Sequence, residues 1–416
     1  MNTSQAIVIV GGGHAAAQLC ASLAEGGAGA RVHLVCVEPR LPYQRPPLSK
    51  SFLKSAAELI QPHRSEAWYA QAGISVHLAD AAVAIDRAAR KLTLQSGKVL
   101  AYGHLVLATG TRARHLPHLL PAPEGLANVA ALRSAADAER LRDQLAAAQH
   151  VTVLGGGFIG LEIAATARAL GKAVTVLEAA PRLLMRSVSP ELAAHVLETH
   201  RSAGIDVRLG VAVGGFEASG GRLQALHADG QRQAVELLVL GVGAVPEHSL
   251  ASAAGLLCEN GISVDALMRT SDPHILAIGD CAHFTEHHSG RHVRLESVQN
   301  ANDQARTAAA TLLGREAPYQ ALPWFWSEQG GMRLQMAGLM LSDGPSVGAS
   351  DCTRHRRPGA TAASFSILHY LGERLVCVES VNAPLDHMAA RKLIEAGKSP
   401  APALACDASV PLKAHV

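Results

Sequence analysis

Two stretches of the chain, residues 6–38 and 150–182, repeat the same order of apolar and polar positions. Each begins with an apolar run rich in β-branched residues, passes through glycines and continues in an alanine-rich stretch with helical periodicity. A second apolar run closed by an acid then follows. Unbroken apolar runs of this kind are typical of central strands in a parallel sheet. Each stretch is therefore predicted to form a strand, a helix and a second strand.

The turn between the first predicted strand and the helix has the spacing of a dinucleotide-binding fingerprint in both stretches. Glycines there allow a pyrophosphate to approach the backbone, the helix N-terminus offers free N–H groups, and the closing acid can bond a ribose hydroxyl. The matching positions are Gly155, Gly157, Gly160 and Glu178 in the second stretch, and Gly11, Gly13, Ala16 and Glu38 in the first. One such turn is weak evidence, but two with their acids predict two nucleotide sites.

Two further apolar runs end in turn residues. The run at 104–114 closes on Thr109 and Gly110, and the run at 274–284 closes on Gly279 and Asp280. The second nucleotide unit ends between them, at about residues 238–250. It is therefore predicted to be inserted into the first.

Composition limits the classes of function. A chain of 416 residues is too long for one hydrophobic core, and its 48% apolar and 17% charged residues favour globular domains over disorder. A formal charge of +2 gives no overall basic footprint for nucleic acid. The start "MNTSQAIVIVGGG" has no basic leader and no apolar run is long enough to cross a bilayer, so we expect neither export nor membrane insertion. Seven cysteines at irregular spacing favour reduced thiols in the cytoplasm.

Longer motifs narrow the prediction. They read YQRPPLSKSFL at 43–53, RLESVQNANDQA at 294–305, PWFWSEQ at 323–329 and SVNAPLDHMAARKLI at 380–394. With the fingerprints, they resemble the two-dinucleotide flavoproteins of the pyridine nucleotide-disulfide oxidoreductase superfamily. The branch they resemble is the FAD-dependent NADH:ferredoxin reductases of bacterial oxygenase systems, of the putidaredoxin reductase and aromatic-ring dioxygenase reductase type.

The resemblance, which runs from about residue 7 to 394, implies an α/β fold with two Rossmann-like domains and a C-terminal α+β domain. It places FAD binding in 1–111 and 246–323, NAD binding in 112–245, and the last domain in 324–416. The segment from about residue 396 is rich in proline and small residues, so poor order is expected there.

The resemblance also implies cofactors and the residues that contact them. FAD would contact Gly11, Gly13, Ala16, Glu38, Arg45, Lys50, Thr109, Gly110, Arg112, Asp280, Val298 and Trp326. NADH would contact Gly155, Gly157, Ile159, Gly160, Glu162, Glu178 and Gly243. A carboxylate at Glu178 favours NADH over NADPH, although Arg182 and Arg186 nearby are of the type that accepts a 2′-phosphate.

The implied reaction is hydride transfer from NADH to FAD, followed by release of single electrons to a [2Fe-2S] ferredoxin. Lys50 would be the fixed cation that favours reduced flavin, because Pro46 and Pro47 stiffen the segment before it. Glu162 would be its ion-pair partner. The alternative for Lys50 is a solvated surface position. Val298 would start a helix aimed at the flavin, and Trp326 would cover the ring or line the electron path, with core packing as the alternative for Trp326 and Trp324.

Thiol and metal chemistry are not expected. Disulfide reductases and related peroxidases of this fold place cysteine beside the flavin, whereas 38–50 holds none and Cys36 lies within an apolar strand. Four histidines between 283 and 292 fit no established zinc spacing and are interpreted as a surface loop.

Other functions stay open. These are rubredoxin reductase, monodehydroascorbate reductase and a redox-sensing flavoprotein similar to apoptosis-inducing factor, and the chain is expected to be a monomer or a homodimer. Basic residues of the last domain would offer an acidic ferredoxin a docking surface, namely Arg354, Arg356, Arg357, Arg391 and Lys392.

Overall fold

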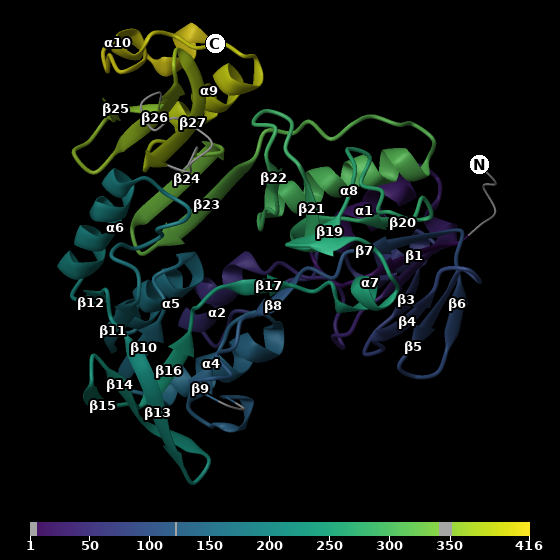
Figure 1. Ribbon diagram of the computed structural model, residues 1–416, viewed down its shortest axis with the longest axis horizontal. Helices are drawn as coiled ribbons and strands as arrows, with labels where there is room; N and C mark the ends of the chain where they lie inside the picture. Colours follow the sequence, from purple (N-terminus) through teal and green to yellow (C-terminus); the bar gives the residue numbers. More distant parts are fainter. Residues whose placement is uncertain (1–5, 121–122, 341–351) are drawn as a thin grey trace. The chain divides into compact units, whose positions relative to one another are not determined.

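The computed structural model describes residues 6–120, 123–340 and 352–416. The chain divides into two compact units, each assembled from separate stretches of sequence (Figure 1). The first comprises Met1–Arg45, Ile60–Arg112 and Val245–Pro323, and the second comprises Pro46–Leu59, Ala113–Ala244 and Trp324–Val416. The predicted FAD-binding pieces differ from the first unit mainly in residues 46–59, which pack in the second.

A parallel sheet with the strand order β20-β7-β1-β2-β3 forms the centre of the first unit. Its strands span Ile7–Val10 (β1), Val32–Val35 (β2), Ser75–His77 (β3), His104–Leu107 (β7) and Ile275–Ala277 (β20). All of β1 is buried, which accounts for its unbroken apolar sequence. β20 pairs with β7 although residues 113–244 of the other unit separate them in sequence.

Helices α1 (His14–Glu25) and α8 (Val298–Leu312) lie side by side on this sheet (Figure 1). Small side chains such as Ala16 and Ala305 are fully buried, and this lets the helices approach closely. The other elements are η1 (Gly29–Arg31), α3 (Glu66–Gln71), β4 (Ala82–Asp86), β5 (Lys91–Leu94), β6 (Val99–Ala101), β8 (Thr111–Ala113), β17 (Ala244–Pro246), α7 (Ser249–Ala253), β18 (Cys258–Glu259), β19 (Gly261–Ser263), η4 (Gly279–Cys281), β21 (Ala282–Thr285) and β22 (His292–Val293).

The second unit contains another parallel sheet, with the order β12-β11-β10-β16-β9. Its main elements are β9 (Val129–Ala130), α4 (Ala135–Ala147), β10 (His150–Leu154), α5 (Phe158–Ala169), β11 (Ala173–Glu178), α6 (Pro190–Ser202), β12 (Asp206–Leu209) and β16 (Leu237–Leu240). The short η3 (Pro123–Gly125) and an antiparallel sheet of β13 (Val213–Ser219), β14 (Arg222–Ala228) and β15 (Gln231–Ala234) complete this half.

Residues 46–59 add a 3-10 turn, η2 (Pro46–Ser49), and a short helix, α2 (Ser51–Lys54), to the second unit. Thr166 of α5 donates a hydrogen bond to the Ser49 carbonyl at 2.9 Å, and the Arg142 guanidinium lies 4.3 Å from the Phe52 ring centroid. These contacts explain why residues 46–59, which include Lys50, belong with α4 and α5.

An antiparallel sheet, β23-β24-β27-β26-β25, forms the rest of the second unit. Its elements are β23 (Trp324–Gln329), β24 (Met332–Gly338), β25 (Cys352–Pro358), β26 (Phe365–Leu371), β27 (Arg374–Val381) and α9 (Pro384–Glu395). β23 packs on α5, where the rings of Phe325 and Phe158 lie 4.7 Å apart.

The last residues, for which poor order was expected, are packed instead. They form α10 (Pro402–Ala405) and η5 (Leu412–His415), and Leu412 is buried. The buried Arg357 guanidinium pairs with Asp386 at 3.0 Å. It also donates hydrogen bonds of 2.7–2.9 Å to the carbonyls of Ala405, Asp407 and Val410. Arg357 therefore holds the chain end and is not part of the basic surface predicted for this domain.

Candidate functional site

The first glycine turn has the conformation that close backbone contact requires. Gly11 has a φ of +130°, and a Cβ there would lie 2.1 Å from the Ala108 carbonyl oxygen. α1 starts directly after Gly13, and within the described residues no side chain caps its N-terminus. The N–H groups of this helix end are therefore suited to an anionic ligand.

The second turn repeats the arrangement. Gly155 has a φ of +107°, and a Cβ there would lie 2.4 Å from the Gly241 carbonyl oxygen. A Cβ at Gly160 would lie 2.5 Å from the Gly155 carbonyl oxygen, so alanine does not fit here as it does at Ala16. α5 begins after Gly157, again without a side-chain cap among the described residues.

Three other long helices begin differently, although α9, like the fingerprint helices, has no side-chain cap within the described part of the chain. Ser134, Ser189 and Ser297 cap α4, α6 and α8 with their hydroxyl groups. The two fingerprint helices combine an uncapped N-terminus with a glycine turn that allows close approach, and the residues fit two phosphate-bearing cofactors.

Each closing acid is already hydrogen-bonded, Glu178 as the last residue of β11 and Glu38 in the loop that follows β2. Glu178 accepts hydrogen bonds from the backbone N–H groups of Gly156 at 2.5 Å and Ala180 at 2.7 Å. Glu38 accepts hydrogen bonds from the Tyr43 hydroxyl at 2.7 Å and the Arg45 guanidinium at 2.8 Å. The structure therefore joins Arg45 and Glu38, both predicted to contact FAD.

The two arginines beyond Glu178 differ in their surroundings. Arg182 donates hydrogen bonds of 2.7 Å to the carbonyls of Met185 and Val188, whereas Arg186 is exposed. Gly243, with a φ of +98°, lies near the Arg186 side chain. Ile159, in the first turn of α5, is 48% exposed.

Glu247 organises the turn after β7, which the sequence did not reveal. Thr109 Oγ1 donates to the Glu247 carbonyl at 2.5 Å, and Glu247 N donates to the Gly110 carbonyl at 2.9 Å. The Glu247 carboxylate lies 3.3 Å from the Arg112 guanidinium. In the sequence, the one feature that could have indicated this role was the position of Glu247 directly after the inserted unit.

Asp280 and Val298 are brought to the same region of the first unit. Asp280 lies in η4, directly after β20, and Val298 is the first residue of α8. The Gly279 N–H donates to Gln304 Oε1 of α8 at 2.7 Å, which ties this turn to the helix.

Lys50 and Glu162 form the predicted ion pair in the second unit. Lys50 Nζ lies 2.7 Å from Glu162 Oε2, and their side chains are 20% and 3% exposed. Lys50 Nζ also donates to the Pro46 carbonyl at 3.2 Å, so the diproline segment holds the ammonium directly. Lys50 is therefore not a solvated surface lysine.

Two serines complete the surroundings of Glu162. Ser49 Oγ donates to Glu162 Oε2 at 2.5 Å, and Ser327 Oγ of β23 donates to Oε1 at 2.7 Å. Both serines lie in the motifs quoted above, but no role was predicted for them. The available signal was the position of these serines in the motifs that hold Lys50 and Trp326, because a buried carboxylate requires hydrogen-bond donors.

The tryptophans lie on the other face of β23. The ring centroids of Trp324 and Trp326 are 5.5 Å apart, and both side chains are partly buried. The Arg391 guanidinium lies 5.0 Å from the Trp324 ring centroid. This cluster combines aromatic rings with a cation at a partly exposed position.

Three buried thiols of the first unit are not suited to catalysis. Among the described residues, which include all seven cysteines, none is in a disulfide. Burial raises the pKa of the Cys36 thiol to about 12, and burial also raises the pKa values of Cys20 and Cys281. A thiol that stays protonated is a poor nucleophile.

The four histidines interpreted as a surface loop do not all lie in one, because His283 is buried in β21 and His292 lies in β22. Within the described residues, no group of three or more His, Cys, Asp or Glu side chains is arranged to hold a metal ion. His288 Nε2 lies 3.0 Å from the Gln320 carbonyl oxygen, and His283 Nδ1 lies 3.5 Å from the Glu259 carboxylate.

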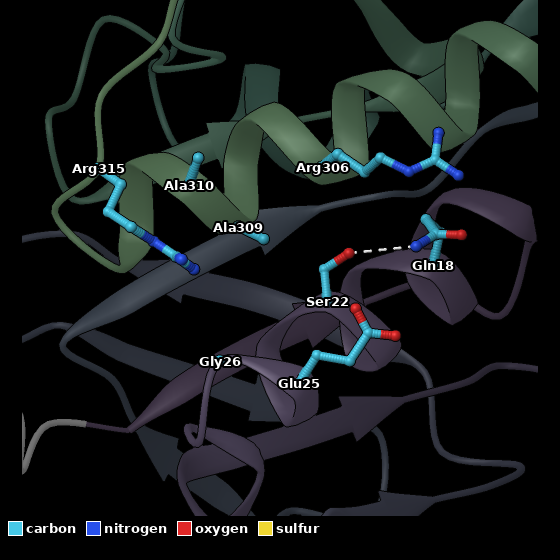
Figure 2. A pocket seen from close by; sticks show the side chains of 8 residues that line it. All are labelled: Gln18, Ser22, Glu25, Gly26, Arg306, Ala309, Ala310 and Arg315. Carbon is cyan, nitrogen blue, oxygen red and sulfur yellow. Dashed lines mark hydrogen bonds between the residues drawn. The ribbon is translucent and has the colours of Figure 1, made fainter.

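A polar groove of about 320 Å³ lies between α1 and α8 (Figure 2). Gln18, Ser22 and Glu25 line it from α1, and Arg306 and Arg315 from the other side. Ser22 and Glu25 lie in the second half of α1, whereas Gln18 lies in its first half. Arg306 lies in the second half of α8, and Arg315 follows the end of that helix. The residues that line the groove do not include those of the glycine turn.

The chain matches two family models. One, described as pyridine nucleotide-disulphide oxidoreductase, matches residues 5–305, and one described as reductase C-terminal matches residues 324–416. In the described part of the chain, no helix is long and apolar enough to cross a membrane.

Similar proteins cover nearly the whole chain. Rhodocoxin reductase of Rhodococcus erythropolis is 41% identical over 98% of this chain and 93% of its own length. Putidaredoxin reductase of Pseudomonas putida is 39% identical over 99% of this chain and 97% of its own length. A crystal structure of a ferredoxin reductase from Rhodopseudomonas palustris is 43% identical, covers 99% of this chain and 100% of that one, and has a TM-score of 0.91.

Proposed function

Because the chain belongs to the pyridine nucleotide-disulphide oxidoreductase family, we propose that it carries electrons from NADH through FAD to a [2Fe-2S] ferredoxin that feeds an oxygenase. The family matches and the coverage of the relatives confirm the resemblance seen in the motifs. The protein is an oxidoreductase that uses FAD and NAD(P)H. Its similarity to reductases of several ferredoxins, across almost all of its length, supports the ferredoxin as acceptor.

We assign FAD to the first glycine turn and the nicotinamide nucleotide to the second. Each uncapped helix N-terminus offers backbone N–H groups and a positive dipole end to a pyrophosphate. Glu178 ends β11 and Glu38 follows β2, each at the position expected for a ribose-binding acid. FAD supplies the conversion of a two-electron donor into single-electron transfer.

The Lys50–Glu162 pair carries the mechanistic part of the proposal. Lys50 holds a positive charge at a place fixed by the Pro46 carbonyl and the Glu162 carboxylate. A preorganised cation stabilises negative charge as it develops, without reorganising at the moment of reaction. Residues 38–50 contain no cysteine. In this proposal the Lys50 ammonium therefore occupies the place that a redox-active cysteine has in disulfide reductases and peroxidases of this fold.

NADH is the preferred nucleotide in this proposal. The carboxylate of Glu178 repels a 2′-phosphate, and the Arg182 donors already bond to Met185 and Val188 carbonyls. Arg186, which is exposed and lies near Gly243, is the side chain that would bind a 2′-phosphate if NADPH were used.

Rubredoxin is the second acceptor to test, because two rubredoxin-NAD(+) reductases are 38% identical over 91% of this chain. A cytoplasmic location belongs to the proposal as well, supported by the seven cysteines, all within the described residues, which form no disulfide.

The deciding experiment couples NADH oxidation to cytochrome c reduction with added [2Fe-2S] ferredoxin, rubredoxin or neither. The cofactor is first released and identified by chromatography, with one FAD per chain expected. Ferredoxin should stimulate turnover far above the rate without an acceptor protein. Stimulation by rubredoxin alone would reassign the acceptor, and stimulation by neither would contradict the reductase proposal and favour a redox-sensing role.

A further inference from the structure

A chain of buried hydrogen bonds continues from Glu162 through β23 to α6. Ser327 Oγ donates to Glu162 at 2.7 Å, Gln329 Nε2 donates to Ser327 Oγ at 3.2 Å, and His200 Nε2 lies 2.8 Å from Gln329 Oε1. The exposed fractions of these four side chains do not exceed 3%. Water therefore does not compete with the chain.

All hydrogens in this chain point toward the carboxylate. Ser327 has one hydroxyl hydrogen and uses it on Glu162, so its oxygen accepts from the Gln329 amide. The Gln329 oxygen then faces His200, which must donate from Nε2. Burial lowers the pKa of His200, which agrees with a neutral ring that carries one hydrogen. Donors aligned in one direction polarise one another and strengthen the final bond to a charged acceptor.

The alternation of β23 explains why these residues meet. Successive side chains point to opposite faces, so Phe325, Ser327 and Gln329 share one face and Trp324 and Trp326 share the other. On α5, Phe158 and Glu162 are one helical turn apart and lie on one side of the helix. Phe158 meets Phe325 and Glu162 meets Ser327, so the strand and helix are matched at two successive points.

We propose that Ser327, held by Gln329 and His200, is a positioning residue that keeps the Glu162 carboxylate aimed at Lys50. This rests on the proposed function, in which Lys50 stabilises charge during flavin reduction. Ser49 and Lys50 both bond to Oε2, whereas Ser327 serves Oε1. Without the Ser327 hydroxyl, one carboxylate oxygen is buried without this donor, and the orientation of the pair toward Lys50 is no longer enforced.

The test uses the full-length, FAD-loaded protein with Ser327→Ala, Lys50→Met and the double variant. Ser366→Ala is the matched control, because Ser366 is a fully buried serine of the same sheet whose hydroxyl lies 2.8 Å from that of Ser380. For each variant we would measure FAD content, melting temperature, the limiting rate of flavin reduction by NADH in stopped flow, the dissociation constant of NADH, and the midpoint potential of the bound flavin.

Ser327→Ala should lower the limiting rate about tenfold, less than the ~10²–10³-fold typical of donors that face the developing charge directly. It should also make the flavin potential more negative and leave NADH binding within about twofold. In the Lys50→Met background it should change rate and potential little further, because both changes act on one unit. Ser366→Ala should change neither.

Equal rates and potentials in Ser327→Ala and the parent would overturn the proposal, as would equal losses in Ser366→Ala. If Lys50→Met also has the parent rate, then the proposed role of Lys50 itself is wrong. If Lys50→Met is slow and Ser327→Ala is not, only the positioning role fails. Should Ser327→Ala lose FAD, Gln329→Leu decides instead, with an expected two- to threefold loss of rate and a shifted potential, and a parent-like result would contradict the proposal.

Discussion

Replacing Arg357 by methionine should release the C-terminal segment. The guanidinium is buried, pairs with Asp386 and binds backbone carbonyls of residues 405, 407 and 410. Methionine fills most of the volume but supplies no donor. Breaking a buried charge pair by removing one partner costs about 3–5 kcal/mol. We expect a loss of this size in the free energy that closes the segment 400–416 onto α9.

Arg356→Met is the control, because Arg356 is the neighbouring arginine on the opposite face of β25. Its ion pair with Glu191 joins side chains that are 48% and 38% exposed, which contributes about 1 kcal/mol at most. Its guanidinium also lies 3.8 Å from the Phe365 ring centroid, which adds about 0.5–1 kcal/mol. The two variants should therefore differ by about 2 kcal/mol.

Native-state hydrogen exchange of the amides in α10 and η5 measures this difference. A gap of about 2 kcal/mol corresponds to exchange about 30-fold faster in Arg357→Met than in Arg356→Met. Amides of the parallel sheet in the same unit serve as an internal reference and should change little. Equal protection of the C-terminal amides in both variants would refute the reasoning that Arg357 holds this segment.

Further predictions concern the chemistry. Lys50→Met should slow flavin reduction by NADH by about ten- to a thousandfold with FAD still bound, because a fixed cation is lost; stopped-flow rates equal to the parent would contradict this. Steady-state kcat/KM should favour NADH over NADPH, and Arg186→Met should lower kcat/KM for NADPH alone, whereas a preference for NADPH would show that Glu178 does not exclude the 2′-phosphate. Ferredoxin-dependent turnover should fall as salt rises from low ionic strength to beyond about 0.1 M, and more weakly in an Arg354→Gln/Lys392→Gln variant, since both side chains are exposed. Turnover that does not depend on salt would contradict the charged docking surface but not the assignment of a ferredoxin as acceptor.

The sequence predicted the fold where local pattern and chemistry coincide. The two glycine turns, their strands and their acids are encoded within about thirty residues each, so both βαβ units could be recognised from spacing alone. The Lys50–Glu162 pair was predicted through the resemblance of the motifs around it. The structure adds the distance and the fixed position of the ammonium.

What sequence missed depends on contacts between distant segments. Arg357 lies in the run RHRRP, which has no apolar alternation to show which arginine faces inward. Ser327 was not predicted to act because its face on β23 is set by packing on α5. The order of the chain end depends on carbonyls that meet Arg357 about fifty residues away in sequence.

The assignment of residues 46–59 to the second unit restricts how this protein can be recombined with its relatives. A chimaera that exchanges only residues 112–245 would combine Glu162 of one parent with Ser49 and Lys50 of the other. Any mismatch there leaves a buried carboxylate short of partners, at a cost of about 3–5 kcal/mol. Crossover points that respect the packing must move three stretches together, Pro46–Leu59, Ala113–Ala244 and Trp324–Val416. Transferring the nucleotide preference of one relative to another by recombination is therefore expected to require crossovers at the ends of all three stretches.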